Sequence, residues 1–350
     1  MYTSQSLSVR WNAVVSDSFE CLNGIKQGGV LSPVLFCVYM DELLGRLKAS
    51  GIGCFIGNLF CGALSYADDL AILAPTHYSM CQLLNVCQTF ADEFHVMFNS
   101  TKSHLLYFNP HPRMRRSVNP ITINGEPIEY VDSAIHLGTY IGKNANALNM
   151  RRVSLDLYTK MNTIKSLYKH CSVDVLCSLF KSYCTSFYGS PLWNLGCAEF
   201  NELYISYKKC IKHLLGLNMR TRSMNLPVIM GQPDLLSLLL SRFASFWNTC
   251  TESTNGLVHI CTKLSPSSAT SVGLNLLKLA QFLQCDEDEL QHSPQTLKKR
   301  ILIKSDSHVT SDSLARGMFI REILKIKKGL LTCILNAGEL EELLLNICII

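Results

Sequence analysis

The spacing of apolar and polar residues changes near residue 143. Before it, short alternating or β-branched runs are separated by polar bends, a pattern typical of short strands, with a few helical segments between them. After it, apolar residues recur every three to four positions, as in helices that bury one face. This change predicts an α+β module to about residue 143, followed by an all-helical region with loops near 218–232, 251–275 and 305–312 and helices over 147–170, 173–188 and 199–216.

The α+β module begins with an alternating stretch, residues 6–24, which predicts two short strands around a polar bend. A strongly helical segment follows and extends to about residue 50. Ser32 can cap its first turn, Pro33 suits the first helical position, and Gly51 stands where the helix should stop.

The other predicted elements of the module follow the same two patterns. One helix, residues 77–95, places six apolar residues on a single face: Leu83, Leu84, Cys87, Phe90, Ala91 and Phe94. The predicted strands and turns are a hairpin at 59–74, two short strands around Asn99–Lys102, a loop at 109–120, a hairpin with Asn124 and Gly125 at its turn, and one strand at 134–142.

Composition narrows the class of protein. Of the 350 residues, 48% are hydrophobic and 17% are charged, which predicts a folded chain with a real core. The 16 cysteines include no C-x-x-C pair and follow no secretory signal, so we expect reduced, mostly buried thiols in an intracellular protein of the nucleus or cytoplasm. The apolar runs are too short to cross a membrane. A net charge of +5 is compatible with a polyanionic partner but does not demand one.

Two adjacent carboxylates, Asp68 and Asp69, stand between two apolar runs in the segment GALSYADDLAILAP, residues 62–75. Adjacent carboxylates repel, and a dry setting raises the pKa of at least one unless a cation is bound. The segment alone is compatible with a solvated Asp-rich turn or with half of a metal site.

Four motifs in order carry a resemblance to a known family. GIKQGGVLSP at residue 24 is followed by YADD, by FN-x-x-K ending at Lys102, and by HLGTYIG from His136. Together they resemble the palm of reverse transcriptases, and the residues of the motifs are most similar to those of the non-LTR, LINE-type retrotransposon branch. The resemblance covers roughly residues 5–250. A group II intron maturase fits YADDLAILAPT and FNSTKS less well.

The resemblance implies an RNA-directed DNA polymerase that extends a DNA primer on an RNA template from deoxynucleoside triphosphates, through two-metal nucleotidyl transfer with Mg²⁺ or Mn²⁺. It makes Asp68 the inward metal ligand and Asp69 its more peripheral partner, with Tyr66 and Ala67 beside the primer end.

The other motifs receive roles in the same way. Gln27 and Gly28 would lie under the incoming nucleotide and the template base, although a plain helix-start loop would also explain the glycines. Lys102 matches a lysine near the triphosphate and is equally compatible with a solvated surface position. Leu137 and Gly138 match the primer grip, where the alternative is an ordinary edge strand.

Basic residues gather in three short clusters: Arg113, Arg115 and Arg116; Arg151 and Arg152; and Lys298, Lys299 and Arg300. Such runs are usually solvated, but Arg151 and Arg152 begin a predicted thumb helix. We therefore expect them to contact nucleic-acid phosphates in a salt-sensitive, sequence-independent way.

The domain prediction is a partial reverse transcriptase palm at 1–143, a helical thumb-like region at 144–250 and a helical tail at 251–350. The family's first catalytic aspartate lies on an earlier strand, and Asp17 is on the wrong element to replace it. We therefore expect this chain to be inactive by itself. The alternative function is a non-catalytic, nucleic-acid-binding remnant of a retroelement.

Overall fold

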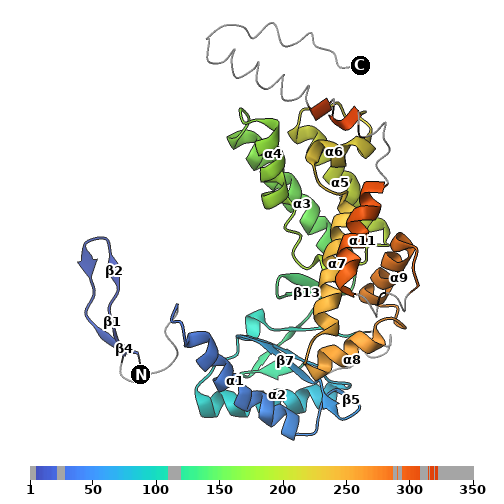
Figure 1. Cartoon of the computed structure of the whole chain (residues 1–350). Helices are drawn as coiled ribbons and strands as arrows, with labels where there is room; N and C mark the ends of the chain where they lie inside the picture. The colour runs from blue at the N-terminus through green and yellow to red at the C-terminus, as the bar shows by residue number, and fades with distance from the viewer. Residues whose placement is uncertain are drawn as a thin grey trace. The chain divides into compact units, whose positions relative to one another are not determined.

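The computed structural model describes residues 5–21, 28–108, 120–286 and 294–307, together with residues 290, 314, 316–318 and 320–321. The chain forms two compact units, Met1–Leu137 and Gly138–Ile350 (Figure 1). The predicted loop at 109–120 lies, except for its last residue, outside the described residues.

The first unit combines helices with short strands. This content confirms the α+β class that the sequence predicts for it. Its two α-helices are α1 (Ser32–Ala49) and α2 (His77–Phe94), and a 3-10 turn spans Ser100–Lys102. Its strands are β1 (Gln5–Leu7), β2 (Arg10–Trp11), β3 (Val14–Val15), β4 (Phe19–Cys21), β5 (Phe55–Ile56), β6 (Leu59–Phe60), β7 (Ala63–Tyr66), β8 (Asp69–Ile72), β9 (His104–Leu105), β10 (Thr122–Ile123), β11 (Glu126–Pro127), β12 (Glu129–Tyr130) and β13 (Ser133–His136).

The strands pair two by two. Antiparallel pairs join β1 to β4, β2 to β3, β5 to β6, β7 to β8 and β10 to β11, whereas β9 and β12 run parallel. The predicted hairpins at 59–74 and at Asn124–Gly125 are confirmed, and both turn residues of the second have positive φ, as a type I′ turn requires. A two-stranded pair is at best marginally stable by itself and gains stability from further strands or from packing against a helix.

Helix α1 begins differently from the prediction. Ser32 is its first helical residue, and the residue before it, Leu31, caps the helix without a side-chain hydrogen bond, so the predicted Ser32 cap is wrong. Pro33 still fits, because the first turn needs no N–H from it. The helix stops where expected: Ser50 ends it, and Gly51 follows with φ +67°.

Helices α1 and α2 hold the first unit together. Leu43 and Leu47 of α1 and Leu83, Cys87 and Phe90 of α2 share one core. The predicted apolar face of α2 is confirmed, because five of its six members are buried and Phe94 is half-buried.

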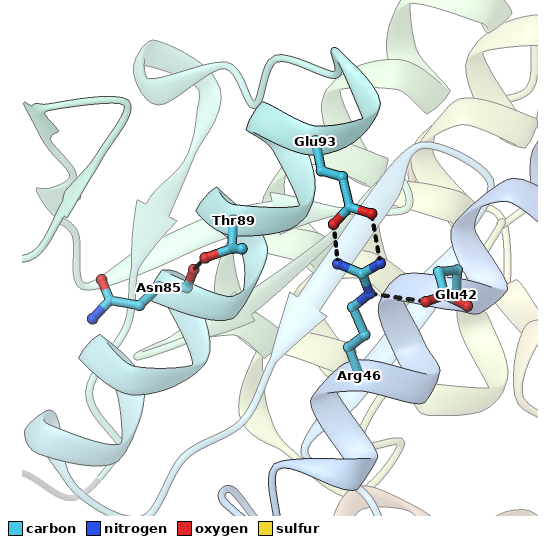
Figure 2. Close-up of polar contacts among 5 residues, drawn as sticks. All are labelled: Glu42, Arg46, Asn85, Thr89 and Glu93. Atoms are coloured by element: carbon cyan, nitrogen blue, oxygen red, sulfur yellow. Dashed lines mark hydrogen bonds and ion pairs between the residues drawn. The ribbon is translucent and has the colours of Figure 1, made fainter.

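Charge reinforces this packing of α1 on α2. Arg46 of α1 makes a bidentate contact with Glu93 of α2, at 2.6 and 3.2 Å, and also bonds Glu42 at 2.9 Å (Figure 2). Its guanidinium also lies over the rings of Phe90 and Phe94. The hydrogen bonds from Arg46 lower the pKa of Glu93.

Two strand predictions in the first unit are wrong. Among the described residues, no strand lies between the end of α2 and Asn99; instead the Asn99 side chain accepts a bond from the Lys102 N–H and starts a 3-10 turn. Asparagine competes for backbone donors in this way and interrupts an extended run. The single strand predicted at 134–142 is divided by a turn at Leu137 and Gly138 into β13 and β14.

In the described residues of the second unit, β14 (Thr139–Gly142) is the only strand, and the other regular elements are helices. Its helices are α3 (Ala145–Leu167), α4 (Val173–Leu179), α5 (Ala198–Leu214), α6 (Leu226–Met230), α7 (Leu235–Thr251), α8 (Gly256–Leu264), α9 (Ser271–Leu283) and α11 (Pro294–Ser307). A π-helical turn at Phe180–Cys184 and 3-10 turns at Ser190–Leu192 and Ser223–Asn225 complete it. The all-helical prediction from about residue 144 is thus confirmed for the part of it that the structure describes.

One hydrophobic core runs through the second unit, from Met150 in α3 to Ile301 in α11. Helix α7 lies in the middle of this core, with α11 and α9 beside it (Figure 1). Two segments predicted as loops contain helices: α6 lies within 218–232, and α8 lies within 251–275. Both helices are short, and they gain stability from packing rather than from a long periodic pattern.

The described cysteines are all free thiols, and five of them are buried: Cys61, Cys87, Cys177, Cys184 and Cys210. Burial raises the pKa of Cys87 to about 12. Within the described residues, no helix combines the length and the apolar character needed to cross a membrane.

Candidate nucleotidyl-transfer site

The hairpin of β7 and β8 presents the two adjacent aspartates at its tip. The strands pair in register from Ala63 opposite Ile72 to Tyr66 opposite Asp69, which leaves Ala67 and Asp68 as a two-residue turn. Ala67 has φ +52°, a conformation that L-residues other than Asn and Asp rarely adopt. Such strain persists only where the surrounding structure enforces it, and it is common at functional sites.

The back of this hairpin is anchored in the core of the first unit. Ala63, Leu70 and Ile72 pack against the core that α1 and α2 form. Leu73 N–H donates to the Gly62 carbonyl at 2.8 Å and extends the pairing beyond the strands. The apolar runs on both sides of the aspartates therefore fix the hairpin, while its tip stays in solvent.

Tyr66, Ala67, Asp68 and Asp69 are all exposed. The structure therefore brings together the four residues that the sequence places at the primer end and the metal. Two exposed carboxylates on a rigid turn fit a Mg²⁺ ion, which takes hard oxygen ligands and is commonly held by one or two carboxylates plus substrate phosphates. Among the described residues, no group of three acidic, His or Cys side chains could hold a metal ion by itself. The hairpin accordingly supplies only part of a coordination shell.

The glycine-rich segment before α1 is described only in part. Gln27 lies outside the described residues. Gly28 has φ +79° and is exposed, and a Cβ placed on it would meet nothing within 4 Å. The backbone at Gly28 is therefore open to a ligand and adopts a conformation that favours glycine.

Lys102 ends the 3-10 turn that Asn99 caps, and its side chain is exposed. The Ser100 hydroxyl contacts the Glu126 carboxylate, and the Asn124 side chain contacts the Phe98 carbonyl, so several bonds fix the turn. No recorded contact joins Lys102 to the aspartates of the hairpin.

The predicted primer grip is a tight turn in which Leu137 has φ +46° and Gly138 has φ +75°. A Cβ on Gly138 would lie 3.3 Å from the ring of Tyr188, so this position has little room for a side chain. Arg152 of α3 donates from Nη1 to the Gly138 carbonyl at 3.2 Å. The sequence analysis did not predict this bond, which joins two residues 14 positions apart in the chain.

Two of the three basic clusters are among the described residues. Arg151 and Arg152 are exposed in the first turns of α3, and Lys298 and Lys299 are exposed on α11. The cluster of Arg113, Arg115 and Arg116 lies outside the described residues.

Comparison with known proteins agrees with the motifs. Residues 2–144 match the family described as reverse transcriptase (RNA-dependent DNA polymerase). The match, together with relatives from non-LTR retrotransposons, confirms the resemblance to a LINE-type reverse transcriptase over this part of the chain. Reverse transcriptases generally use divalent metal ions, nucleotides and a nucleic-acid template.

Its relatives are proteins of mobile elements. A segment of 117 residues is 32% identical to the Retrovirus-related Pol polyprotein from the type-2 retrotransposable element R2DM of Drosophila melanogaster, over 33% of this chain and 11% of that protein. The R2 polyprotein of Nasonia vitripennis is 28% identical over 138 residues, or 38% of this chain and 13% of that protein. The RNA-directed DNA polymerase of the mobile element jockey of Drosophila funebris is 23% identical over 217 residues, or 57% and 23%. The chain thus spans less than a quarter of each of these relatives.

Proposed function

We propose that this chain is the part of a retrotransposon RNA-directed DNA polymerase that presents the metal-binding hairpin and contacts the primer. The observation that carries the proposal is the β7–β8 hairpin, whose Ala63, Leu70 and Ile72 pack against the core while its tip exposes Asp68 and Asp69, inside the segment that matches reverse transcriptases. The strain at Ala67 supports the same assignment.

Each residue then has a distinct part in primer extension. Asp68 and Asp69 would hold Mg²⁺ or Mn²⁺, whose positive charge stabilises the charge that develops on the transferred phosphoryl group. Asp68 lies in the turn itself and is the inward ligand, whereas Asp69 starts β8 and lies at the edge of the site. Tyr66 and Ala67 border the primer end.

The other proposed positions surround the reaction. Gln27 and the open backbone at Gly28 contact the incoming deoxynucleotide and the template base. Lys102 lies near the triphosphate and can donate a proton to the leaving pyrophosphate. Leu137 and Gly138 contact the primer backbone. We place the palm at 1–143, the thumb at 144–250 and a tail at 251–350.

The test is primer extension by a protein in which the corresponding upstream part of the R2DM polyprotein precedes residue 5. Asp68→Asn keeps the shape of the side chain but removes its charge, so we expect extension on an RNA template to disappear. Asp69→Asn should leave part of the rate. Asp41→Asn, an exposed position on α1, serves as the control and should leave the rate unchanged. Near-normal rates for both hairpin variants would show that this hairpin is not the metal site.

A second candidate function, nucleic-acid binding without polymerisation, is supported by the start of α3. Because Nη1 of Arg152 already bonds the Gly138 carbonyl, that guanidinium is held at the proposed primer grip. Arg151 beside it is exposed and can contact a phosphate. The 350-residue chain would then bind nucleic acid without extending it, since its described residues offer only part of a metal site.

A further inference from the structure

Positive charge is concentrated in one part of the second unit. From residue 203 to 233 the sequence contains five Lys or Arg residues and no Asp or Glu, and from 157 to 173 it contains three Lys residues and no acid. These two stretches form the C-terminal halves of α3 and α5 and the loop after α5, and α3 and α5 pack against each other. The charge is therefore local and is not a property of the whole surface.

Side chains from the two helices meet at this end. Lys165 of α3 and His213 of α5 lie 3.0 Å apart, from Nζ to Nε2. An ammonium group has only donors, so the imidazole nitrogen accepts this bond. Lys209 lies four residues before His213 on the same face of α5. Tyr168 is the C-cap residue of α3 and lies three residues after Lys165 in the chain. Tyr168 is 41% exposed, and both lysines are exposed.

The loop after α5 adds two arginines to this end. Lys212 donates from Nζ to the Met219 carbonyl at 3.0 Å and draws the loop back onto the end of α5. Asn218 accepts a bond from the Arg220 N–H and fixes the next turn. The side chains of Arg220 and Arg222 are both exposed.

Four of these cations, Lys165, Lys209, Arg220 and Arg222, have no ion pair with any described residue. Other cations of the same unit are paired: Lys160, earlier on α3, bonds Asp156 at 2.7 Å, and Arg321 bonds Asp174 at 2.6 Å. Uncompensated like charges repel one another, and an anionic partner removes that repulsion.

We propose that this surface, formed by Lys165, Tyr168, Lys209, His213, Arg220 and Arg222 and called the α3–α5 patch, binds single-stranded nucleic acid. The cations contact successive phosphates, and the exposed ring of Tyr168 stacks on a base, a combination typical of sequence-tolerant single-strand binding. Tyrosine stacking favours a single strand, because bases inside a duplex do not offer their faces.

The α3–α5 patch is distinct from the arginines at the start of α3. Lys165 is 14 residues after Arg151 on the same helix, which is about 21 Å at 1.5 Å per residue. The proposal goes beyond the polymerase function and does not depend on it, because binding at the patch needs neither metal nor nucleotide.

The experiment measures binding of the 350-residue chain to fluorescein-labelled single-stranded RNA, single-stranded DNA and duplex DNA by anisotropy over a range of salt. Lys165→Gln combined with Lys209→Gln removes two phosphate contacts. We expect the slope of log affinity against log salt for single strands to fall by about 1.4, or about 0.7 per contact. Tyr168→Ala should weaken single-strand binding roughly tenfold, whereas Tyr168→Phe should keep it.

Two controls separate the patch from general charge effects. Lys298→Gln with Lys299→Gln removes the same charge from α11 and should leave the slope unchanged. Arg151→Ala should lower duplex binding and leave the Tyr168 effect intact. Heparin, a polyanion without bases, is a further probe. The proposal is overturned if both lysine pairs give the same slope. It is also overturned if Tyr168→Ala is neutral and the Lys165→Gln, Lys209→Gln variant loses as much affinity for heparin as for single strands. RNA and DNA compared at equal salt show which strand the patch prefers. Because no arm measures extension, failure of the polymerase proposal leaves this result interpretable.

Discussion

Asn275, on helix α9, offers a sharp test of what holds the second unit together. Its side chain is fully buried, at 0% exposure, and satisfies two backbone groups of one segment. Its Nδ2 donates to the Trp193 carbonyl at 2.6 Å, and its Oδ1 accepts from the Leu195 N–H at 3.0 Å. Trp193 and Leu195 are themselves almost wholly buried, so water cannot replace either bond.

The cost of Asn275→Ala follows from those two bonds. Each buried backbone group that loses its partner costs about 1–3 kcal/mol, so the pair should lower the free energy of unfolding by about 2–5 kcal/mol, after a small gain in helix propensity. That is a large fraction of the stability of a typical domain, about 5–15 kcal/mol.

Tryptophan fluorescence during urea unfolding reports on the stability of the second unit, where Asn275 lies. Of the three tryptophans, Trp193 and Trp247 are buried in the second unit, whereas Trp11 is 79% exposed and reports little change. At an m-value of about 2 kcal/mol/M, the expected loss moves the urea midpoint down by about 1–2.5 M. Asn162→Ala, on the exposed face of α3, is the matched control and should leave the midpoint nearly unchanged.

Asn275→Asp distinguishes lost hydrogen bonds from lost packing, because the two side chains have nearly the same shape. The carboxylate can still accept from Leu195 but faces the Trp193 carbonyl, so burial should raise its pKa. A group with a raised pKa stabilises the fold below its unfolded pKa and loses that contribution as pH rises through the folded value. The variant should therefore approach wild-type stability near pH 4 and be weakest near neutrality. A midpoint loss under about 0.5 M for Asn275→Ala would refute this reasoning.

Two further predictions concern the first unit. Because Arg46 lowers the pKa of Glu93 from its ordinary value of 4.5, the ion pair stabilises the unit above that pH and its contribution is lost as pH falls further; Glu93→Gln should remove this acid sensitivity, measured by far-UV circular dichroism between about pH 3 and 7. Because burial raises the pKa of Cys87 to about 12, a thiol reagent at about pH 8 should label the exposed Cys37 rapidly and leave Cys87 unlabelled until the unit unfolds, as mapped by peptide mass spectrometry.

The sequence predicted elements well where a long periodic pattern met a clear stop. The face of α2 and the end of α1 before Gly51 are correct, because burial of one helix face and a left-handed glycine are local requirements. It failed where bonds between distant residues decide the structure. Helix α8 has only nine residues, and its residue types do not distinguish it from a loop. The Asn99 cap replaced an expected strand for a different, local reason, because an asparagine side chain competes for nearby backbone donors.

The candidate site follows the same division. The tip of the β7–β8 hairpin could be predicted, since the sequence places two carboxylates between apolar runs, and pairing in register leaves them exposed at the bend. Two features could not be predicted from spacing. The left-handed φ of Ala67 depends on which two residues form the turn, and a shift of one residue would move it to Asp68 and reverse the faces of both strands. The bond from Arg152 to the Gly138 carbonyl depends on how α3 packs after β14.

The same physical contrast separates the two kinds of site in this chain. At the hairpin, the two carboxylates belong to adjacent residues, so the backbone holds them close together. The sequence alone therefore indicates that a cation would stabilise this turn. At the α3–α5 patch, the cations come from two helices and a loop, and only the 3.0 Å contact between Lys165 and His213 shows that they share one surface. The repulsion between any two of these cations is weak in water, but it adds up over the whole patch. A partner whose negative charges are spaced along a chain can relieve it. A nucleic-acid strand has that spacing, whereas a single small anion would compensate only one or two of the cations.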